Sequence, residues 1–105
     1  MSPIWFQILL ALADADRHGL GIMQEVLDRT QGSMRLWPGM LYRNLQKLEG
    51  EHLIEEVDGD GAPMAGSPRF YRLTAAGRRA CTAEARQLAS YVEAAHDKQL
   101  FKKPH

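Results

Sequence analysis

A short basic stretch near the middle of the chain could recognise nucleic acid. The side chains suited to this are Met40, Arg43, Asn44 and Lys47. Their i, i+3, i+4 and i+7 spacing places them on one face of a helix, without an acidic residue among them. Arginine and lysine can donate to guanine, asparagine can pair with adenine, and methionine can contact a thymine methyl group. An ordinary solvated helix face looks similar, so the surrounding elements must decide between the two interpretations.

The chain has no net charge, but its charges are unevenly distributed. Thirteen Lys and Arg residues balance thirteen Asp and Glu residues. Residues 31–47 and 69–79 contain only basic charges, whereas residues 49–60 contain six acids. Local fields steer DNA toward a protein, so the two basic segments carry more information than the neutral total.

The sequence contains no recognisable arrangement for catalysis or metal binding. The histidines are scattered, at His18, His52, His96 and His105, without cysteines or carboxylates at metal-ligand spacing. Gly19 and Gly21 lack the preceding strand and the following lysine of a phosphate-binding loop. Cys81 falls on an apolar stripe, where a structural thiol is expected. We therefore expect a protein that is not an enzyme and that holds no metal or cofactor.

Residues 4–13 form an apolar run interrupted only by Gln7. The run is too short to span a bilayer, and no Lys or Arg precedes it as a signal peptide requires. We interpret it as a buried helix. The single cysteine cannot form an intramolecular disulfide, which favours the reducing cytoplasm. A length of 105 residues fits one structural domain.

The periodicity predicts four helices and one hairpin. Helices are expected at residues 3–13, about 20–30, from 38 to about 48 and from 75 to the late nineties, with strands at 53–57 and 69–73. Pro38 suits a first helical turn, Gly32 ends the second helix, and Thr74 is a candidate N-cap of the last. Residues 58–68 are rich in Gly and Pro, as in a long hairpin loop. This order predicts a mainly α fold with a small β-hairpin: a winged helix-turn-helix in residues 1–74 and a long C-terminal dimerisation helix in residues 75–105.

In a helix-turn-helix the recognition helix enters the major groove, so this context favours the DNA interpretation. Tyr42 could reach phosphate or pack half-buried under the second helix. The second strand would lie near phosphates or the minor groove, while Asp58 and Asp60 argue against a contact by the first half of the loop. The expected DNA-binding residues are Arg35, Pro38, Gly39, Met40, Tyr42, Arg43, Asn44, Lys47, Arg69 and Tyr71.

The last helix carries a second pattern. Its residues Cys81, Ala85, Leu88, Val92 and Ala95 are spaced 4, 3, 4, 3, as in a two-stranded coiled coil. The alternative is that this stripe packs on the first helix of the same chain. That helix has apolar residues to spare, so we expect a homodimer in which Ile4, Trp5 and Leu9 join the stripe. A two-fold dimer would present two recognition helices to half-sites roughly 34 Å apart.

Three aromatic residues suggest further roles. Trp5 and Phe6 could line a pocket for a small hydrophobic or aromatic effector. For Trp5, core packing is the more common role of such a residue. Trp37 precedes Pro38 and is expected to cap the entrance to the third helix.

Three segments resemble the PadR family of winged-helix transcriptional regulators. Residues 18–22 (HGLGI) are similar to the His-Gly-Tyr opening of that family's second helix, and residues 38–42 (PGMLY) to its Pro-Gly-Thr-Leu-Tyr motif. Residues 70–78 (FYRLTAAGR) resemble its Tyr-Tyr-x-Leu-Thr-x-x-Gly-Arg junction. The match covers about residues 8–80. It implies a homodimeric, usually repressing regulator on a palindromic operator, often with a hydrophobic effector site near the dimer interface.

Three positions depart from the family pattern. Leu20 replaces the usual tyrosine, which removes a hydroxyl group. Trp37 replaces a common capping serine, and an unreplaced cap would cost the helix roughly 1 kcal/mol. His52 stands where a left-handed glycine is usual, so either His52 adopts a positive φ or Gly50 ends the helix early.

These observations together predict a sequence-specific, DNA-binding transcriptional regulator. We expect a ligand-responsive repressor that acts in the cytoplasm as a homodimer on duplex DNA, without a membrane partner. The alternative is a winged helix that binds only other proteins. The neutral net charge and the acidic residues that open the loop support that alternative.

Overall fold

The chain folds as a winged helix with a long C-terminal helix, as the sequence predicts. A computed structural model describes residues 1–57 and 69–102. Its elements are α1 (Pro3–Ala11), β1 (Arg17–His18), α2 (Gly19–Arg29), α3 (Pro38–Gly50), β2 (Ile54–Val57), β3 (Phe70–Leu73) and α4 (Ala75–Asp97). The predicted long loop with Asp58 and Asp60 lies outside the described residues. None of the helices that the structure describes combines the length and apolar character needed to cross a membrane.

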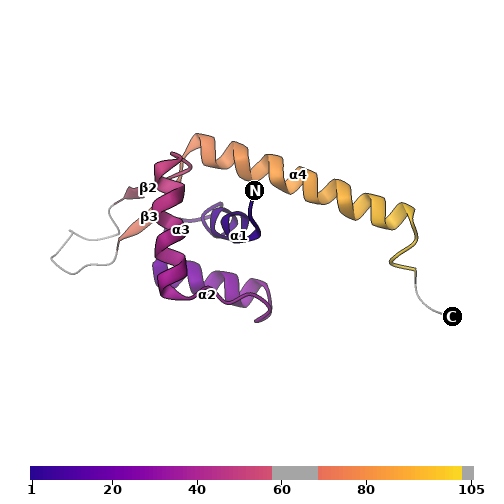
Figure 1. Cartoon of the computed structure of the whole chain (residues 1–105), viewed down its shortest axis with the longest axis horizontal. Coiled ribbons are helices and arrows are strands. Elements are labelled where there is room, and N and C mark those ends of the chain that lie inside the picture. Colours follow the sequence, from indigo (N-terminus) through magenta and orange to yellow (C-terminus); the bar gives the residue numbers. More distant parts are fainter. Residues whose placement is uncertain (58–68, 103–105) are drawn as a thin grey trace.

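The core is built around α1. In Figure 1, α1 lies to the right of α3, with α2 below it and the first part of α4 above it. The buried side chains on the helices include Ile8, Leu9, Leu12, Ile22, Val26, Leu41, Leu45 and Leu48. α1 ends at Ala11, two residues before the predicted end. An apolar helix covered on several sides explains why the run from residue 4 is apolar almost all round.

The sheet has one strand more than predicted. It is antiparallel with the order β1-β3-β2, and β1 pairs Arg17 with Tyr71 and His18 with Phe70. On the other side of β3, Ile54 lies opposite Leu73. Since β1 leads directly into α2, this pairing fixes the start of α2 beside the wing, the β2–β3 hairpin.

Side chains cap three of the four helices. Ser2 Oγ accepts from the amide of Trp5 at 3.1 Å, and His18 Nδ1 accepts from the amide of Gly21 at 2.8 Å. Thr74 Oγ1 accepts from the amide of Gly77 at 2.9 Å, which confirms the predicted cap of α4. Thr74 Oγ1 also donates to the carbonyl of His52 at 2.7 Å, so this residue joins the ends of two helices.

The predicted capping role of Trp37 is wrong. Its side chain makes no hydrogen bond to the first amides of α3, because an indole offers a donor but no acceptor. Its backbone carbonyl accepts from Leu41 N at 2.8 Å, which is the ordinary first bond of the helix.

The end of α3 uses His52 in the left-handed conformation. Its φ is 59°, and the Leu53 amide donates to the Leu48 carbonyl at 3.0 Å across this turn. This geometry is that of a Schellman motif, which usually employs glycine. The prediction that His52 adopts a positive φ is confirmed, while Gly50 remains helical.

α4 is attached to the core only through its first turns. Gly77 and Cys81 are its buried residues, and most of the helix beyond Glu84 is exposed. A Cβ at Gly77 would collide with the carbonyl oxygen of Leu53, so this glycine allows the close approach of α4 to the turn after α3. Figure 1 shows the remainder of α4 extending away from the body of the protein. With this helix included, the molecule measures 60 Å along its longest axis.

Candidate nucleic-acid interface

The exposed face of α3 is rotated from the predicted one. Its exposed residues include Gly39, Tyr42, Arg43, Gln46 and Lys47, whereas Met40 and Asn44 are half-buried. At about 100° per residue, Asn44 lies only about 70° from the centre of the buried leucine stripe, while Arg43 and Gln46 lie on the far side of the helix. The four predicted side chains therefore do not form one free ridge.

Asn44 is held inside the protein by two hydrogen bonds. Its Oδ1 accepts from Trp5 Nε1 at 3.0 Å, and its Nδ2 donates to the carbonyl of Met40 at 2.7 Å. Met40 itself packs against the hydrophobic core. The predicted base contacts of Asn44 and Met40 are therefore not supported by their placement, and Arg43 and Lys47 remain as the exposed cations.

A groove separates α3 from the wing. It has a volume of about 420 Å³ and is lined by Gly39, Tyr42, Arg43, Gln46, Glu49, Arg69 and Tyr71. It brings Arg43 from one basic segment and Arg69 from the other to the same place. Gln46 was missed by the sequence analysis, although it lies opposite the buried leucines, three residues from Arg43. An amide at this position can donate to and accept from the edge of adenine.

Arg69 lies at the edge of this groove with a weak partner. Its Nε is 3.2 Å from Glu56 Oε1, and its side chain is 73% exposed. Exposed ion pairs contribute little free energy, so the guanidinium can exchange Glu56 for a phosphate. The two neighbouring arginines have structural partners instead. Arg72 binds Asp16 at 2.8 Å, and Arg78 donates to the carbonyl of Ala13 at 3.0 Å.

Tyr71 forms the floor of the groove rather than a free donor. Its side chain is only 4% exposed, which leaves little surface for the predicted phosphate contact. Burial raises the pKa of its hydroxyl above the ordinary value, and the carboxylates of Glu49 and Glu56 raise it further. Tyr71 therefore stays protonated and neutral in the groove that Arg43 and Arg69 also line.

Tyr42 is packed on one side and exposed on the other. Its side chain is 47% exposed. Its hydroxyl lies against Gly19 at the start of α2, so closely that a Cβ on Gly19 would collide with it. Tyr42 also lines a smaller hollow of about 270 Å³ with His18, Leu20 and Arg69. The ring thus fills the junction of α2, α3 and the wing, where a phosphate could meet its edge.

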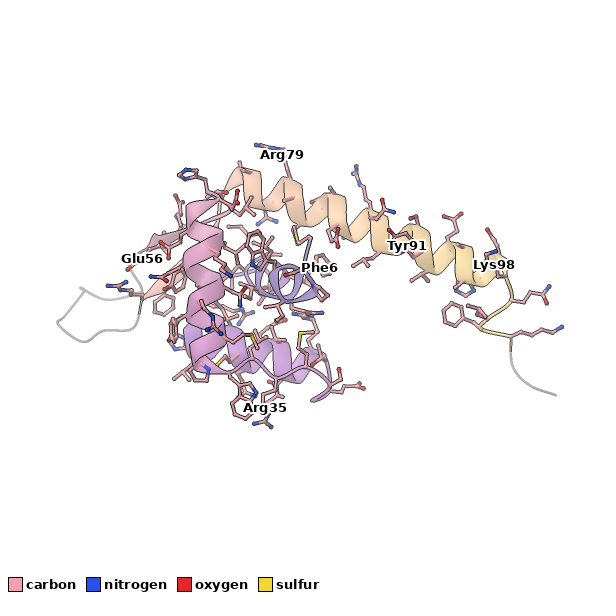
Figure 2. The ribbon with its side chains drawn as sticks, in the orientation of Figure 1. Phe6, Arg35, Glu56, Arg79, Tyr91 and Lys98 are labelled. Carbon is pink, nitrogen blue, oxygen red and sulfur yellow. The ribbon has the colours of Figure 1, made fainter. Side chains whose placement is uncertain are left out.

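Arg35 and Trp37 lie just before α3 and are both exposed. The guanidinium carbon of Arg35 is 5.6 Å from the centroid of the Trp37 ring, a cation–π contact. Figure 2 shows Arg35 at the end of the molecule where α3 begins. Pro38 and Gly39 are exposed beside them.

Comparison with known proteins identifies the family. The model of the PadR-like family of transcriptional regulators matches residues 8–83. This chain belongs to the PadR-like family. The family is one of transcriptional regulators and not of enzymes, as the sequence predicts.

Two relatives match more than two thirds of this PadR-like chain. Transcriptional regulator Rv3488 of Mycobacterium tuberculosis is 37% identical over 89 residues, which are 83% of this chain and 77% of the relative. Uncharacterized protein X of Lysinibacillus sphaericus is 35% identical over 71 residues, or 68% of this chain; the match spans only 64% of that relative's length.

Two PadR structures show the same fold at low sequence identity. A PadR family regulator from Clostridium difficile R20291 superposes with a TM-score of 0.77 at 20% identity, covering 93% of this chain and 99% of the other. Bacillus subtilis PadR, solved in complex with operator DNA, superposes with a TM-score of 0.69 at 20% identity. That comparison covers 81% of this chain and 47% of the longer protein.

In the structure, the predicted dimer residues differ in their exposure to solvent. Leu9 and Cys81 are buried in the core of the single protomer, so they cannot offer surface to a partner, and the prediction is wrong for these two. Ile4 and Trp5 are half-buried on α1. Of the predicted residues on α4, Ala85, Leu88 and Val92 are exposed and Ala95 is half-buried near the end of the helix. Tyr91, which the heptad pattern omitted, is exposed as well.

Of the two aromatic residues predicted to line an effector pocket, Trp5 has a defined structural role. It packs against the core and binds Asn44, in agreement with the packing alternative for this residue. Phe6 is half-buried on α1, and Figure 2 shows it below α4. An effector site that includes Phe6 stays a prediction.

Proposed function

We propose that this PadR-like chain regulates transcription by binding a palindromic operator as a homodimer. The main support for this proposal is the groove that Arg43 and Gln46 of α3 line together with Arg69 of the wing. A major groove admits one helix, and Arg43 and Gln46 on the exposed face of α3 offer donors suited to guanine and adenine. Arg69, Lys47, Arg35 and the edge of Tyr42 would contact phosphates.

The DNA-bound relative supports this assignment. Bacillus subtilis PadR was solved with operator DNA, and its fold matches this chain over most of the chain's length. In the same geometry the start of α3 would point into the major groove, and the wing would follow the adjacent backbone. Glu49 is the acidic residue that lines the groove, and the exposed pair between Glu56 and Arg69 can open when phosphate arrives.

The experiment is a titration of fluorescent duplex from the region upstream of the chain's own gene, at two salt concentrations. Arg43→Ala should weaken binding by roughly 1–3 kcal/mol. Arg79→Ala is the matched control, because Arg79 is exposed on α4 and points away from the groove (Figure 2). Equal losses in the two variants, or no loss in either, would contradict the proposed face.

The homodimer is proposed from the exposed apolar side of α4. Leu88, Tyr91 and Val92 are 38%, 58% and 50% exposed on a helix that projects away from the core. Two antiparallel or crossed copies of this helix would cover these residues and aim two α3 helices at successive turns of DNA. Val92→Glu should convert the dimer to a monomer in sedimentation experiments, and it should weaken operator binding without altering Arg43.

We further propose that the regulator represses its target and releases DNA when a hydrophobic or aromatic effector binds beside Phe6, at the edge of the dimer interface. A regulator of chromosomal DNA would act in the cytoplasm, where Cys81 would remain a free thiol. The effector proposal is tested by following operator release while a panel of flat aromatic compounds is added to wild type and to Phe6→Ala.

A protein–protein role is the second candidate. The observation that favours it is the neutral net charge, together with Glu55 and Glu56, which are both exposed on β2. If the protein binds no duplex at either low or high salt, that result would favour the protein–protein role over the regulator.

A further inference from the structure

One exposed residue beside the groove has neither a packing nor a capping role. Trp37 is 62% exposed, although tryptophan is a residue that proteins usually bury to a large extent. It occupies the N-cap position of α3, yet its side chain makes no hydrogen bond to the amides of the first turn. The protein thus carries a large apolar side chain on its surface where a small polar one would stabilise the helix better.

The position of Trp37 connects it to the proposed DNA surface. It directly precedes Pro38 and Gly39, and Gly39 begins the exposed face that continues through Tyr42 and Arg43. The first residues of a recognition helix are the ones that reach base edges in the major groove. The indole therefore lies at the end of α3 that would enter the groove first.

The Arg35 side chain makes a cation–π contact with the indole. Its guanidinium carbon lies 5.6 Å from the ring centroid, so one face of the indole is covered by a cation while the remainder is open to solvent. A fixed ring loses less conformational entropy on binding than a free one. The pair thus presents an apolar surface and a positive charge side by side, which complement the apolar methyl group and the negative phosphate of a thymine nucleotide.

We propose that Trp37 is a specificity-determining residue that contacts the methyl group of a thymine in the operator, while Arg35 contacts the neighbouring phosphate. The inference rests on the proposed function and deepens it. The thymine methyl is the apolar group that bases expose in the major groove. Met40, to which the sequence assigned this contact, packs against the core instead. Because the indole carries no charge, its contribution does not depend on salt, whereas that of Arg35 does.

The experiment isolates the methyl group. A duplex is first selected from a random pool with the wild-type protein, and each thymine is then replaced singly by deoxyuridine, which removes only the methyl. We expect one or two replacements in each half-site to weaken wild-type binding by about three- to tenfold. Trp37→Ser should bind the thymine and uracil duplexes equally, and Trp37→Phe should retain part of the difference.

Two controls separate the roles of the pair. Trp37→Ser supplies a capping hydroxyl, so its thermal unfolding should not fall below that of wild type, and a lost DNA contact cannot be attributed to misfolding. Arg35→Ala should lower the slope of log Kd against log salt by about one, whereas Trp37→Ser should leave that slope unchanged.

The outcomes distinguish this inference from the proposed function. Two outcomes overturn the role of Trp37 and leave the proposed regulator intact. In the first, a selected duplex binds tightly but no replacement of thymine by deoxyuridine weakens binding. In the second, the replacement weakens binding by Trp37→Ser as much as binding by the wild type. Failure to select any duplex overturns both.

Discussion

Trp5 on α1 and Asn44 on α3 are joined by a hydrogen bond of 3.0 Å between the indole Nε1 and the amide Oδ1. The bond is partly buried and links the central helix of the core to the middle of the proposed recognition helix. Through the second bond, from Asn44 Nδ2 to the carbonyl of Met40, the amide also joins two turns of α3. The orientation of α3 is therefore fixed by a polar contact as well as by its leucines.

Trp5→Phe should destabilise the protein by about 1 kcal/mol or more, because the Asn44 oxygen loses its donor in a partly buried site. The free energy of unfolding in urea measures this. Trp37→Phe is the control, since it changes the other tryptophan at an exposed position and should leave the unfolding free energy unchanged. Equal stabilities of Trp5→Phe and wild type would show that the contact contributes nothing.

Glu56→Gln should strengthen DNA binding by about two- to fivefold at low salt. The substitution removes a carboxylate beside the groove and frees Arg69 from its exposed partner at 3.2 Å. The gain should shrink as salt is raised, because ions screen exposed charges. Glu93→Gln, which removes a charge from the exposed part of α4, serves as the control. An affinity that falls in Glu56→Gln would mean that the pair holds Arg69 in its binding position.

Gly77→Ala should destabilise the protein by about 2 kcal/mol or more. A methyl group there would meet the Leu53 carbonyl, and neither backbone segment can move without separating α4 from the turn after α3. Gly50→Ala is the matched control. Gly50 lies in α3 with open space around the position of a Cβ, so alanine should stabilise the helix by about 0.5–1 kcal/mol. Thermal unfolding of the two variants should shift in opposite directions.

The stability of the protein should decrease in alkaline solution because of Tyr71. Its pKa is raised by burial and by Glu49 and Glu56, so the folded state holds the phenolic proton more tightly than the unfolded state. The associated stability is fully present below the usual tyrosine pKa of about 10, and it is lost as the pH rises through the folded-state pKa.

Tyr71→Phe keeps the ring and removes the titrating hydroxyl. Its unfolding free energy should therefore decline less than that of wild type between about pH 9 and about pH 11, on either side of the usual tyrosine pKa of about 10. The comparison is best made in a Cys81→Ala background, because burial also raises the pKa of the Cys81 thiol. Parallel curves for the two proteins would assign the alkaline loss to other groups.

Elements that depend on local patterns could be predicted from the sequence. The buried leucines of α3, the Thr74 cap and the left-handed His52 each follow from a repeat or a residue preference within a few positions. The strand β1 could not be predicted, because two residues show no periodicity and their partners lie more than fifty positions later. Its existence depends on tertiary pairing with β3.

The site was predicted less accurately than the fold for a related reason. Asn44 turns inward because its donor is 39 residues away in the chain, and no pattern on α3 reports that contact. Leu9 and Cys81 were assigned to a dimer surface because an apolar stripe has the same appearance whether its own chain or a second copy covers it. Gln46 was missed because the face was chosen by charge instead of by its position opposite Leu41, Leu45 and Leu48.

In the proposed dimer, the length of α4 would make the distance between the two recognition helices sensitive to how the helix is anchored at Gly77. A helix of 23 residues is about 34 Å long, so a tilt of about 10° at its anchored end displaces the far end by about 6 Å. If two copies are joined near that far end, the same tilt in each copy moves its own recognition helix by about 6 Å, which is nearly two base-pair steps of about 3.4 Å. In the proposed dimer, the packing of Gly77 against the Leu53 carbonyl would therefore influence the operator length that two protomers can span.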